Sequence, residues 1–233
     1  MKALVLNSGG VDSTTCVALA IEKYGKENVI TATLYYGQRH AKELVSAKAI
    51  ADHYGVRHIE EDISSVMKYA GNVCSLIKDS KFEIQDKSYA EQKKANADGR
   101  VDTYVPFRNG LLLSIATAYA DALFPNQEAV VVYGAHADDA AGQSYADCSP
   151  QFADAMSKAI ELGTYGKIKV WRPLIHMTKA GVVKEGLRLN VPYELTWSCY
   201  HGGEIACGKC GTCREAIAAF KANGVDYPVP YEK

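Results

Sequence analysis

The chain has 233 residues, of which 48% are hydrophobic, and this size suits one α/β domain with a small appendage. Its formal net charge of −1 gives no overall positive field for gripping long nucleic acid. No stretch is long and apolar enough to span a membrane, and the N-terminus lacks a signal-peptide pattern. We therefore expect a cytoplasmic protein with no direct nucleic-acid or membrane partner.

The first predicted element is a short apolar strand at residues 3–6, which runs into Ser-Gly-Gly-Val-Asp-Ser at residues 8–13. The two glycines allow a sharp turn, and Asp12 and Ser13 suit the first turn or cap of the helix pattern that continues to Tyr24. A helix that begins after such a turn directs N–H groups and the positive end of its dipole at one place. The sequence therefore predicts an anion site for a phosphate or pyrophosphate.

Strand and helix patterns then alternate along the chain. β-rich or apolar runs at residues 29–35, 57–63, 129–133 and 169–174 predict further strands. Helical spacing of apolar residues predicts helices between them, Ser149-Pro150 opens another helix, and residues 178–189 form a weaker one. This rhythm predicts a parallel sheet with helices on both faces, and ligands bind beyond the carboxyl ends of its strands.

Two segments break the rhythm. Residues 78–101 are polar and charged, which indicates an exposed insertion that is partly helical, and a lid and a disordered segment are both compatible with it. A long loop follows Gly134 and contains His136, Asp138 and Asp139, which we expect to be solvated loop residues.

Four of the seven cysteines crowd near the C-terminus as Cys199-x7-Cys207-x2-Cys210-x2-Cys213. Thr212-x-x-Glu215 has the pattern of a capping box, which places Cys213 in the first turn of a last helix. Four thiolates in a compact loop match a closed tetrahedral Zn²⁺ site, and a closed site is structural. An iron–sulfur cluster, a redox disulfide and inert thiols remain alternatives.

The glycine loop is neither a Walker A loop, since it lacks the Lys, nor a dinucleotide site, since it lacks Gly-x-Gly-x-x-Gly. Its residues 8–13 resemble the PP-loop of the ATP pyrophosphatases. Further segments, in the same order over nearly the whole chain, resemble the 7-cyano-7-deazaguanine synthase family, the queuosine-pathway family also called preQ0 synthase. These segments are Tyr36-x-Gln38-Arg39-His40, Val105-Pro106-x-Arg108-Asn109, Tyr145-x-Asp147-Cys148-x-Pro150-x-Phe152, Arg172-Pro173-Leu174 and Thr196-x-Ser198-Cys199-Tyr200.

The resemblance implies a Rossmann-like fold of the adenine nucleotide alpha hydrolase type at residues 1–190 and a small zinc-binding subdomain at residues 191–233. It implies that 7-carboxy-7-deazaguanine and ammonia become the nitrile through adenylated carboxylate and amide intermediates, with ATP and Mg²⁺. ATP would then bind Asn7, Ser8, Gly9, Gly10, Val11, Asp12, Ser13, Thr14, Thr15, Cys16, Val17 and Arg39.

The same resemblance suggests catalytic roles for Asp12, Ser13 and Arg108. The substrate would meet Gln38, Arg108, Asn109 and Asp147, and a carboxylate such as Asp147 can accept from both the N1–H and the 2-amino group of a guanine-like ring. Either Arg39 or Arg108 could equally form an ordinary salt bridge. One structural zinc would sit on Cys199, Cys207, Cys210 and Cys213, and the family suggests a homodimer, which Tyr227 and Tyr231 could serve.

Two other functions stay open on the sequence alone. One is another PP-loop adenylating enzyme, such as a tRNA sulfurtransferase or an amidoligase of the tRNA-lysidine type, which near-neutral charge disfavours. The other is a non-catalytic nucleotide- or zinc-binding module, which the intact loop motif disfavours.

Overall fold

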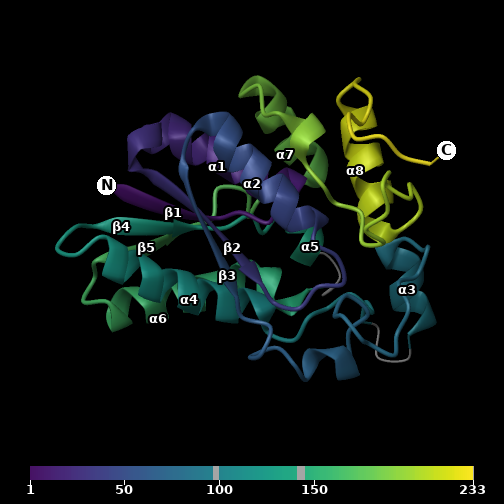
Figure 1. The fold of residues 1–233 in the computed structure, drawn as a ribbon, viewed down its shortest axis with the longest axis horizontal. Helices are drawn as coiled ribbons and strands as arrows, with labels where there is room; N and C mark the ends of the chain where they lie inside the picture. The colour runs from purple at the N-terminus through teal and green to yellow at the C-terminus, as the bar shows by residue number, and fades with distance from the viewer. Residues whose placement is uncertain (97–99, 141–144, 233) are drawn as a thin grey trace.

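The computed structural model describes residues 1–96, 100–140 and 145–232, and at its centre is a parallel sheet (Figure 1). The sheet has five strands in the order β3-β2-β1-β4-β5. They are β1 (Lys2–Leu6), β2 (Val29–Tyr35), β3 (Arg57–Asp62), β4 (Ala129–Val132) and β5 (Ile168–Trp171). Every pairing is parallel, which confirms the predicted parallel α/β sheet.

Eight α-helices lie around the sheet within the described residues. They are α1 (Val11–Tyr24), α2 (Lys42–Tyr54), α3 (Tyr89–Ala95), α4 (Arg108–Leu123), α5 (Ala137–Ala140), α6 (Pro150–Gly163), α7 (Lys179–Arg188) and α8 (Gly211–Ala222). Short 3-10 turns occur at η1 (Lys26–Asn28), η2 (Ala70–Asn72), η4 (Ala146–Cys148) and η5 (Tyr193–Leu195). No helix in these parts of the chain has both the length and the apolar character needed to cross a membrane.

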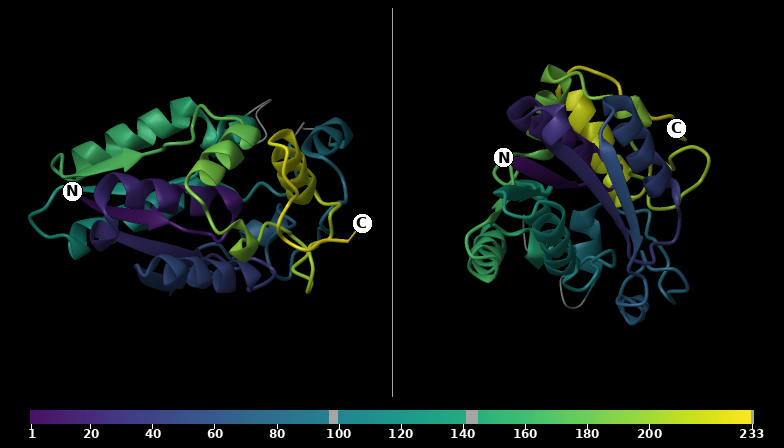
Figure 2. Two further views of the ribbon diagram at one scale, coloured as in Figure 1. Left: turned by 90° about the horizontal axis from the view of Figure 1, so that it is seen from above. Right: turned by 60° about the vertical axis from the view of Figure 1, so that its left-hand side comes forward.

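Helices cover both faces of the sheet, as Figure 2 shows. On β1, the side chains of Ala3 and Val5 pack in the core that contains α1, α7 and α8, whereas Leu4 packs in the core that contains α4 and α6. Adjacent strand residues point to opposite faces, so a strand buried on both faces needs a continuous apolar run. The run at residues 3–6 meets this requirement.

Two helix starts follow directly from local sequence. The Ser149 hydroxyl accepts a hydrogen bond from the Phe152 N–H, and Pro150 occupies the first position of α6. The Thr178 hydroxyl accepts from the Gly181 N–H and caps α7. This helix therefore starts at Lys179, one residue after the predicted start at residue 178. Each cap satisfies a backbone donor that the helix itself leaves free.

The polar insertion at residues 78–101 is partly helical, as expected. It contains α3, which starts with a reciprocal capping box between Ser88 and Glu91. Residues 97–99 of this insertion, and residues 141–144 of the loop after β4, lie outside the described residues. The helix places Tyr89 against the C-terminal segment, and a side chain at Gly211 would meet its ring.

The C-terminal segment after residue 190 shares one core with the sheet domain. Phe220 of α8 packs edge-on against Tyr193 and also contacts Tyr227, in the same core as Val5 and Val17. The expectation that Tyr227 serves a subunit interface is wrong for a simple reason: its side chain is buried inside this core. Tyr231, half-buried, lies beside it.

The predicted capping box at Thr212-x-x-Glu215 is also wrong. Helix α8 begins after Cys210, which is its N-cap residue and makes no side-chain cap. Thr212 and Glu215 therefore fall inside the helix, where they line the cavity described below. Cys213 does occupy the first turn, as expected.

Candidate active site and metal centre

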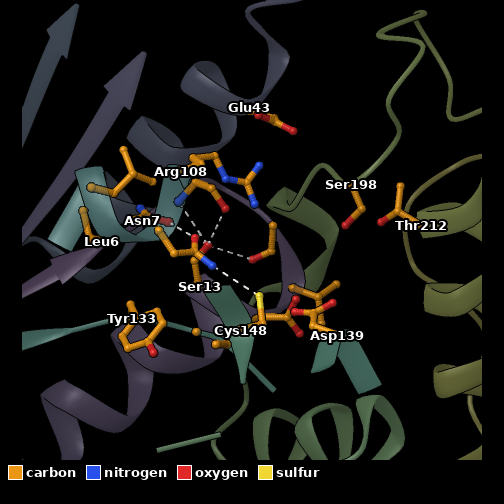
Figure 3. A pocket seen from close by; sticks show the side chains of 18 of the residues that line it. Leu6, Asn7, Ser13, Glu43, Arg108, Tyr133, Asp139, Cys148, Ser198 and Thr212 are labelled. Atoms are coloured by element: carbon orange, nitrogen blue, oxygen red, sulfur yellow. Dashed lines mark hydrogen bonds between the residues drawn. The ribbon is translucent and has the colours of Figure 1, made fainter. Parts of the chain in front are cut away.

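A cavity opens beyond the carboxyl ends of β1, β2 and β4 (Figure 3). The strand order reverses between β1 and β4, because the chain leaves β1 for β2 on one side and leaves β4 for β5 on the other, and open parallel sheets bind ligands at such a point. Among the described residues its lining includes Asn7, Ser8, Gly10, Val11, Asp12, Ser13, Tyr36, Gln38, Glu43, Tyr89, Arg108, Asn109, Asp139, Tyr145, Lys179, Trp197, Ser198, Tyr200, Thr212 and Glu215.

The glycine loop is held by its own polar side chains. The side-chain Oδ1 of Asn7 accepts from the Gly9 N–H at 3.0 Å, and its side-chain Nδ2 donates to the Ala47 carbonyl at 3.0 Å. The Ser13 hydroxyl accepts from the Ser8 N–H at 3.1 Å. These bonds lie within the loop and its immediate supports, so they hold the turn in one conformation.

Gly9 cannot be replaced without displacing a helix. Its φ of +76° lies in the left-handed region, and a Cβ there would stand 2.5 Å from the Glu43 carbonyl oxygen and 2.7 Å from the Ala47 nitrogen. Its carbonyl also accepts from the Trp197 N–H at 2.8 Å. Gly9 thus joins the loop to α2 and to the C-terminal segment, although it does not line the cavity itself.

The N-terminus of α1 faces the cavity without a side-chain cap, because its N-cap residue is Gly10. Val11, Asp12 and Ser13 form the first turn and line the cavity, so their N–H groups and the helix dipole favour an anion there. The next four residues, which the resemblance also placed at ATP, are buried and lie outside the lining. They are Thr14, Thr15, Cys16 and Val17.

Lys179 is the main cation of the cavity, and it was not among the predicted site residues. Its Nζ lies 2.6 Å from Asp12 Oδ2 and 3.7 Å from Glu215 Oε2, and its side chain is only 8% exposed. Burial lowers the pKa of Lys179, but the carboxylates of Asp12, Glu215 and Asp139 outweigh burial and hold that pKa above its ordinary value. Burial likewise raises the pKa of Asp12, and the charges of Lys179 and His136 bring it below its usual range.

His136 is fully buried, so its expected place in solvent is wrong. Its Nε2 lies 3.7 Å from Asp12 Oδ2 and 3.5 Å from Asp139 Oδ2. Asp139 also lines the cavity, while the Asp138 carboxylate accepts from the Lys179 N–H at 2.7 Å. The loop after β4 therefore builds the floor of the site rather than an exposed connection.

Arg108 and Glu43 face the cavity from the starts of two different helices, α4 and α2 (Figure 3). Arg108 Nη1 donates to the Tyr36 hydroxyl at 3.2 Å, and its guanidinium lies over the Tyr36 ring. Glu43 accepts one long hydrogen bond, of 3.5 Å, from the Gln38 amide. Gln38 and Arg108 thus lie at the cavity, as the resemblance implied.

Asp147 and Arg39, expected at the substrate and at ATP, have other partners and lie outside the cavity lining. The Asp147 carboxylate accepts from the Asn109 N–H at 2.9 Å, at the open start of α4. Asn109 lines the cavity, but its amide donates to the Asp147 carbonyl. Arg39 donates to the backbone carbonyls of Ser75 and Phe82, so it anchors a neighbouring loop.

The C-terminal segment closes one side of the cavity. Trp197, Ser198 and Tyr200 line it just before and after the first clustered cysteine, and the Tyr200 hydroxyl lies 3.0 Å from that of Tyr89. His40, which belongs to the same family segment as Gln38, is half-buried with its ring against Gly202 rather than in the lining. The wall is therefore built jointly by the insertion and by the segment that carries the cysteines.

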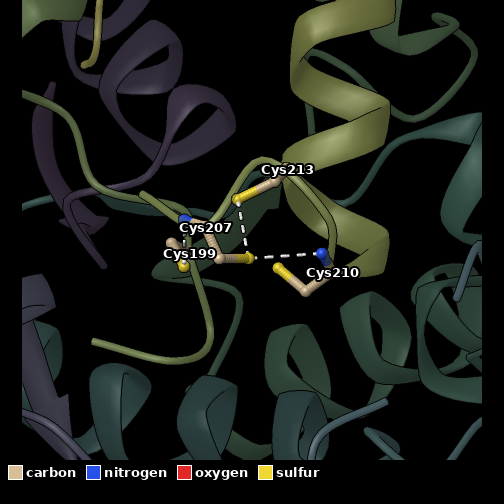
Figure 4. Close-up of side chains that lie close together, drawn as sticks. All are labelled: Cys199, Cys207, Cys210 and Cys213. Atoms are coloured by element: carbon tan, nitrogen blue, oxygen red, sulfur yellow. Dashed lines mark hydrogen bonds between the residues drawn. The ribbon is translucent and has the colours of Figure 1, made fainter. Parts of the chain in front are cut away.

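The four clustered cysteines converge on one point (Figure 4). Their sulfur atoms all lie within 4.8 Å of one another, and Cys207 Sγ is 4.0 Å from Cys213 Sγ. A tetrahedral ion with metal–sulfur bonds of about 2.3 Å holds sulfurs about 3.8 Å apart, so the four residues fit a metal ion. The N–H groups of Lys209 and Cys210 donate to Cys207 Sγ, which stabilises a thiolate. The same set could hold other thiophilic metals.

The missed residues left only weak signals in the sequence. Lys179 is the first residue of α7, where the helix dipole disfavours a cation, and this placement is its one local anomaly. Glu43 and Glu215 look like ordinary first-turn or surface acids, because the direction in which each points depends on how its helix docks.

Comparison with known proteins gives consistent matches. A family model described as queuosine biosynthesis protein QueC matches residues 2–224. The chain is 42% identical to the 7-cyano-7-deazaguanine synthase of Thermoplasma volcanium over 238 residues, which cover 100% of this chain and 91% of that protein. It is 37% identical to the protein of the same name from Psychromonas ingrahamii over 231 residues, covering 99% of this chain and 98% of that protein.

Among solved structures, the chain is similar to the NMN synthetase of Francisella tularensis, with 14% identity and a TM-score of 0.49, covering 97% of this chain and 73% of that one. Similarity at this level assigns no substrate. The family match carries more weight, because residues 2–224 include the glycine loop, the whole cavity lining and all four clustered cysteines.

Proposed function

Because the chain belongs to the family of queuosine biosynthesis protein QueC, we propose that it converts 7-carboxy-7-deazaguanine and ammonia to 7-cyano-7-deazaguanine with ATP. The observation that carries the proposal is one cavity that joins the uncapped start of α1, Lys179 and Arg108. A phosphate site beside a separate guanidinium suits the activation of a carboxylate by ATP. The enzyme is then an ATP-dependent ligase that forms a carbon–nitrogen bond.

The pyrophosphate of ATP binds at the glycine loop, against the N–H groups of the first turn of α1 and the hydroxyls of Ser8 and Ser13. The bonds within the loop support this assignment, because they hold those donors in place before ATP arrives. Lys179 takes the place that the resemblance gave to Arg39. Thr14, Thr15, Cys16 and Val17 support the loop from behind.

Asp12 is the residue that would hold Mg²⁺ with the phosphates. Its Oδ1 is buried and has no hydrogen-bond partner among the described residues, and carboxylate oxygen is a ligand that Mg²⁺ prefers. The ion would neutralise phosphate charge, while Lys179 occupies the other oxygen of the same carboxylate.

The chemistry proceeds by two activations. The substrate carboxylate, held by Arg108, attacks the α-phosphorus and releases pyrophosphate, which gives an acyl-adenylate. Negative charge builds on the departing pyrophosphate, where Lys179 and the first turn of α1 provide fixed donors. Ammonia then displaces AMP to leave an amide. A second ATP then adenylates the amide oxygen with release of pyrophosphate, and loss of AMP and of the protons on the nitrogen leaves the nitrile.

The metal at Cys199, Cys207, Cys210 and Cys213 is zinc in this proposal, with a structural role. The convergence of four sulfurs and their N–H donors supports it, and four thiolates leave no position open for a substrate. When bound, the ion contributes folding free energy to the wall that holds Tyr200.

A homodimer is the assembly we propose, on the family resemblance alone. Light scattering on the purified protein at two concentrations measures it, and a monomeric mass at both would contradict it. The buried Tyr227 plays no part in the contact.

A mass-spectrometric assay tests the reaction. The purified protein is incubated with 7-carboxy-7-deazaguanine, ammonium, ATP and Mg²⁺, and both deazapurine and nucleotide products are read. We expect the nitrile together with AMP and pyrophosphate. Amide that accumulates without nitrile would show that the second activation is missing, and unchanged substrate with ATP bound would overturn the proposed substrate.

A further inference from the structure

One carboxylate of the cavity is not committed to a cation. Four acidic side chains line the cavity, and Asp12 and Glu215 lie near Lys179 Nζ while Asp139 lies 3.5 Å from His136. Glu43 forms no ion pair within the described residues, and its one hydrogen bond is the long one from Gln38. It is therefore an acceptor with free capacity inside a ligand site.

Glu43 lines the cavity from α2, whose backbone at Glu43 also packs against Gly9 of the glycine loop. It belongs to the first turn of α2, and in Figure 3 its side chain and that of Arg108 lie on the side of the view away from Asp139, whereas Lys179 approaches Asp12 from α7. Asp147, the carboxylate expected to meet the substrate ring, is occupied by the N–H of Asn109. Of the two, Glu43 is the carboxylate that a ligand in the cavity can reach.

We propose that Glu43 is a specificity residue, which accepts hydrogen bonds from the N1–H and the 2-amino group of the deazaguanine ring. This inference rests on the proposed function and adds to it the group that reads the purine edge. A carboxylate has two oxygens that can accept from these two adjacent donors at once, whereas Arg108 can only donate and suits the carboxylate of the substrate.

The surroundings of Glu43 favour such a ligand. Burial raises the pKa of its carboxyl group to about 7, and Arg108 and the Gln38 amide offset only part of that effect. A buried carboxylate that accepts few hydrogen bonds is stabilised most by a ligand that supplies two hydrogen-bond donors. A ring that presents an acceptor in place of a donor would face it with like partial charges, so the site also rejects adenine-like edges.

The inference is tested with two substrates and two variants. The substrates are 7-carboxy-7-deazaguanine and the analogue that lacks its 2-amino group, and kcat/KM is measured for each with ATP saturating. Glu43→Gln keeps the shape of the side chain but replaces one acceptor oxygen by a donor. Asp52→Asn, on the exposed part of the same helix, is the matched control for loss of one negative charge.

We expect the natural protein to prefer the 2-amino substrate by about 10- to 100-fold, because the analogue leaves one carboxylate oxygen unpaired. In Glu43→Gln we expect kcat/KM for the natural substrate to fall by a similar factor and the preference to shrink to about 3-fold or less. The KM for ATP should stay within about 2-fold, and the Asp52→Asn protein should behave like the natural one.

Three outcomes would overturn the inference. If the natural protein does not distinguish the two substrates, that result alone overturns the inference. A Glu43→Gln protein that keeps the full preference would do so too, and so would one in which only the KM for ATP rises, since the carboxylate would then contact the ribose hydroxyls. In each case turnover by the natural protein leaves the proposed function standing, whereas no turnover at all would end both. If Glu43→Gln does not fold, the same measurements are made on Glu43→Asp, whose side chain is one methylene shorter and so moves the carboxylate away from the ligand.

Discussion

Lys179 and Asp12 place opposite charges 2.6 Å apart at the first turn of α1. Burial alone would lower the pKa of a lysine and favour its neutral form. Three carboxylates near Lys179 instead keep its pKa above the ordinary value, so it remains charged throughout the working pH range. The pair also holds the lysine in one conformation before any ligand binds. At the scale of single residues, the site is thus a set of prepaired charges that a phosphate can enter.

We expect Lys179→Met to lower kcat/KM for ATP by about 100- to 1,000-fold, because a fixed cation is lost where negative charge builds on pyrophosphate. Steady-state kinetics of pyrophosphate release measure the effect. Lys184→Met, on an exposed position of the same helix, should leave the kinetics unchanged. Near-normal activity of Lys179→Met would remove this residue from the phosphate site.

The raised pKa of Glu43, at about 7, predicts a pH dependence of substrate binding. Below that pH the carboxyl group gains a proton and loses acceptor capacity, so the KM for the deazapurine should rise between about pH 8 and pH 6. The groups that face it do not titrate in this range: Arg108 stays charged, and burial raises the pKa of Tyr36 to about 12. A KM profile that is equally steep in Glu43→Gln would assign the effect to another group.

At the scale of elements, α3 and the cysteine segment hold each other in place. Besides the Tyr89–Tyr200 contact, Arg214 of α8 lies 3.6 Å from Glu91, and His201 lies 2.9 Å from Asp86. Exposed ion pairs of this kind contribute little individually. The insertion and the C-terminal segment therefore contact each other through several weak interactions, so we expect a change at the cysteine cluster to reach α3 as well.

We expect Cys210→Ser to lose the bound metal and to lower the melting temperature by more than about 5 °C, because ligand loss is felt as folding free energy. Metal analysis by mass spectrometry and calorimetry measure the two effects. Cys74→Ala removes a buried thiol far from the cluster and should keep a full complement of metal. Stoichiometric metal in purified Cys210→Ser would exclude Cys210 as a ligand.

Several of these elements could be predicted from the sequence. The parallel sheet, the cap at Ser149 and the crowding of four cysteines were predicted from local patterns, and the structure has all three. The errors at His136 and Glu215 have a different origin. Both are polar residues whose partners, Asp12 and Lys179, lie far away in sequence, and no local pattern reports such a pairing.

Some of the predicted substrate residues line the cavity and others do not. Arg108 and Gln38 belong to segments whose family resemblance is specific, and both line the cavity. Asp147 belongs to an equally specific segment, yet its carboxylate turns to the start of α4. A motif fixes which residues come together, whereas the packing of α4 against η4 decides which way each side chain points.

At the scale of the whole molecule, the sheet domain and the C-terminal segment form a single core. Phe220 is 1% exposed and packs on Tyr193 and Tyr227, in a cluster that also contains residues of β1 and α1. A boundary near residue 190 divides the sequence but does not divide the apolar interior. The two parts should therefore unfold together rather than as separate domains.

We expect Phe220→Ala to lower the free energy of unfolding by about 3 to 5 kcal/mol, because it removes a large side chain from a filled interior. Urea unfolding followed by circular dichroism measures it, and a single transition should persist. Phe82→Ala, at a position that is 44% exposed, should cost less than about 1 kcal/mol. An early second transition confined to the tail would contradict the shared core.

The hydrogen bond from the Trp197 N–H to the Gly9 carbonyl ties the nucleotide loop to a segment that the ribosome makes much later. During translation, Ser8 and Ser13 emerge long before Lys179, and the wall that contains Tyr200 comes later still. A nascent or prematurely released chain therefore has a loop that resembles an ATP site but no cation or wall to complete it. Such a fragment lacks the cation and the wall that complete the cavity, so we expect the order of synthesis itself to reserve catalysis for finished molecules.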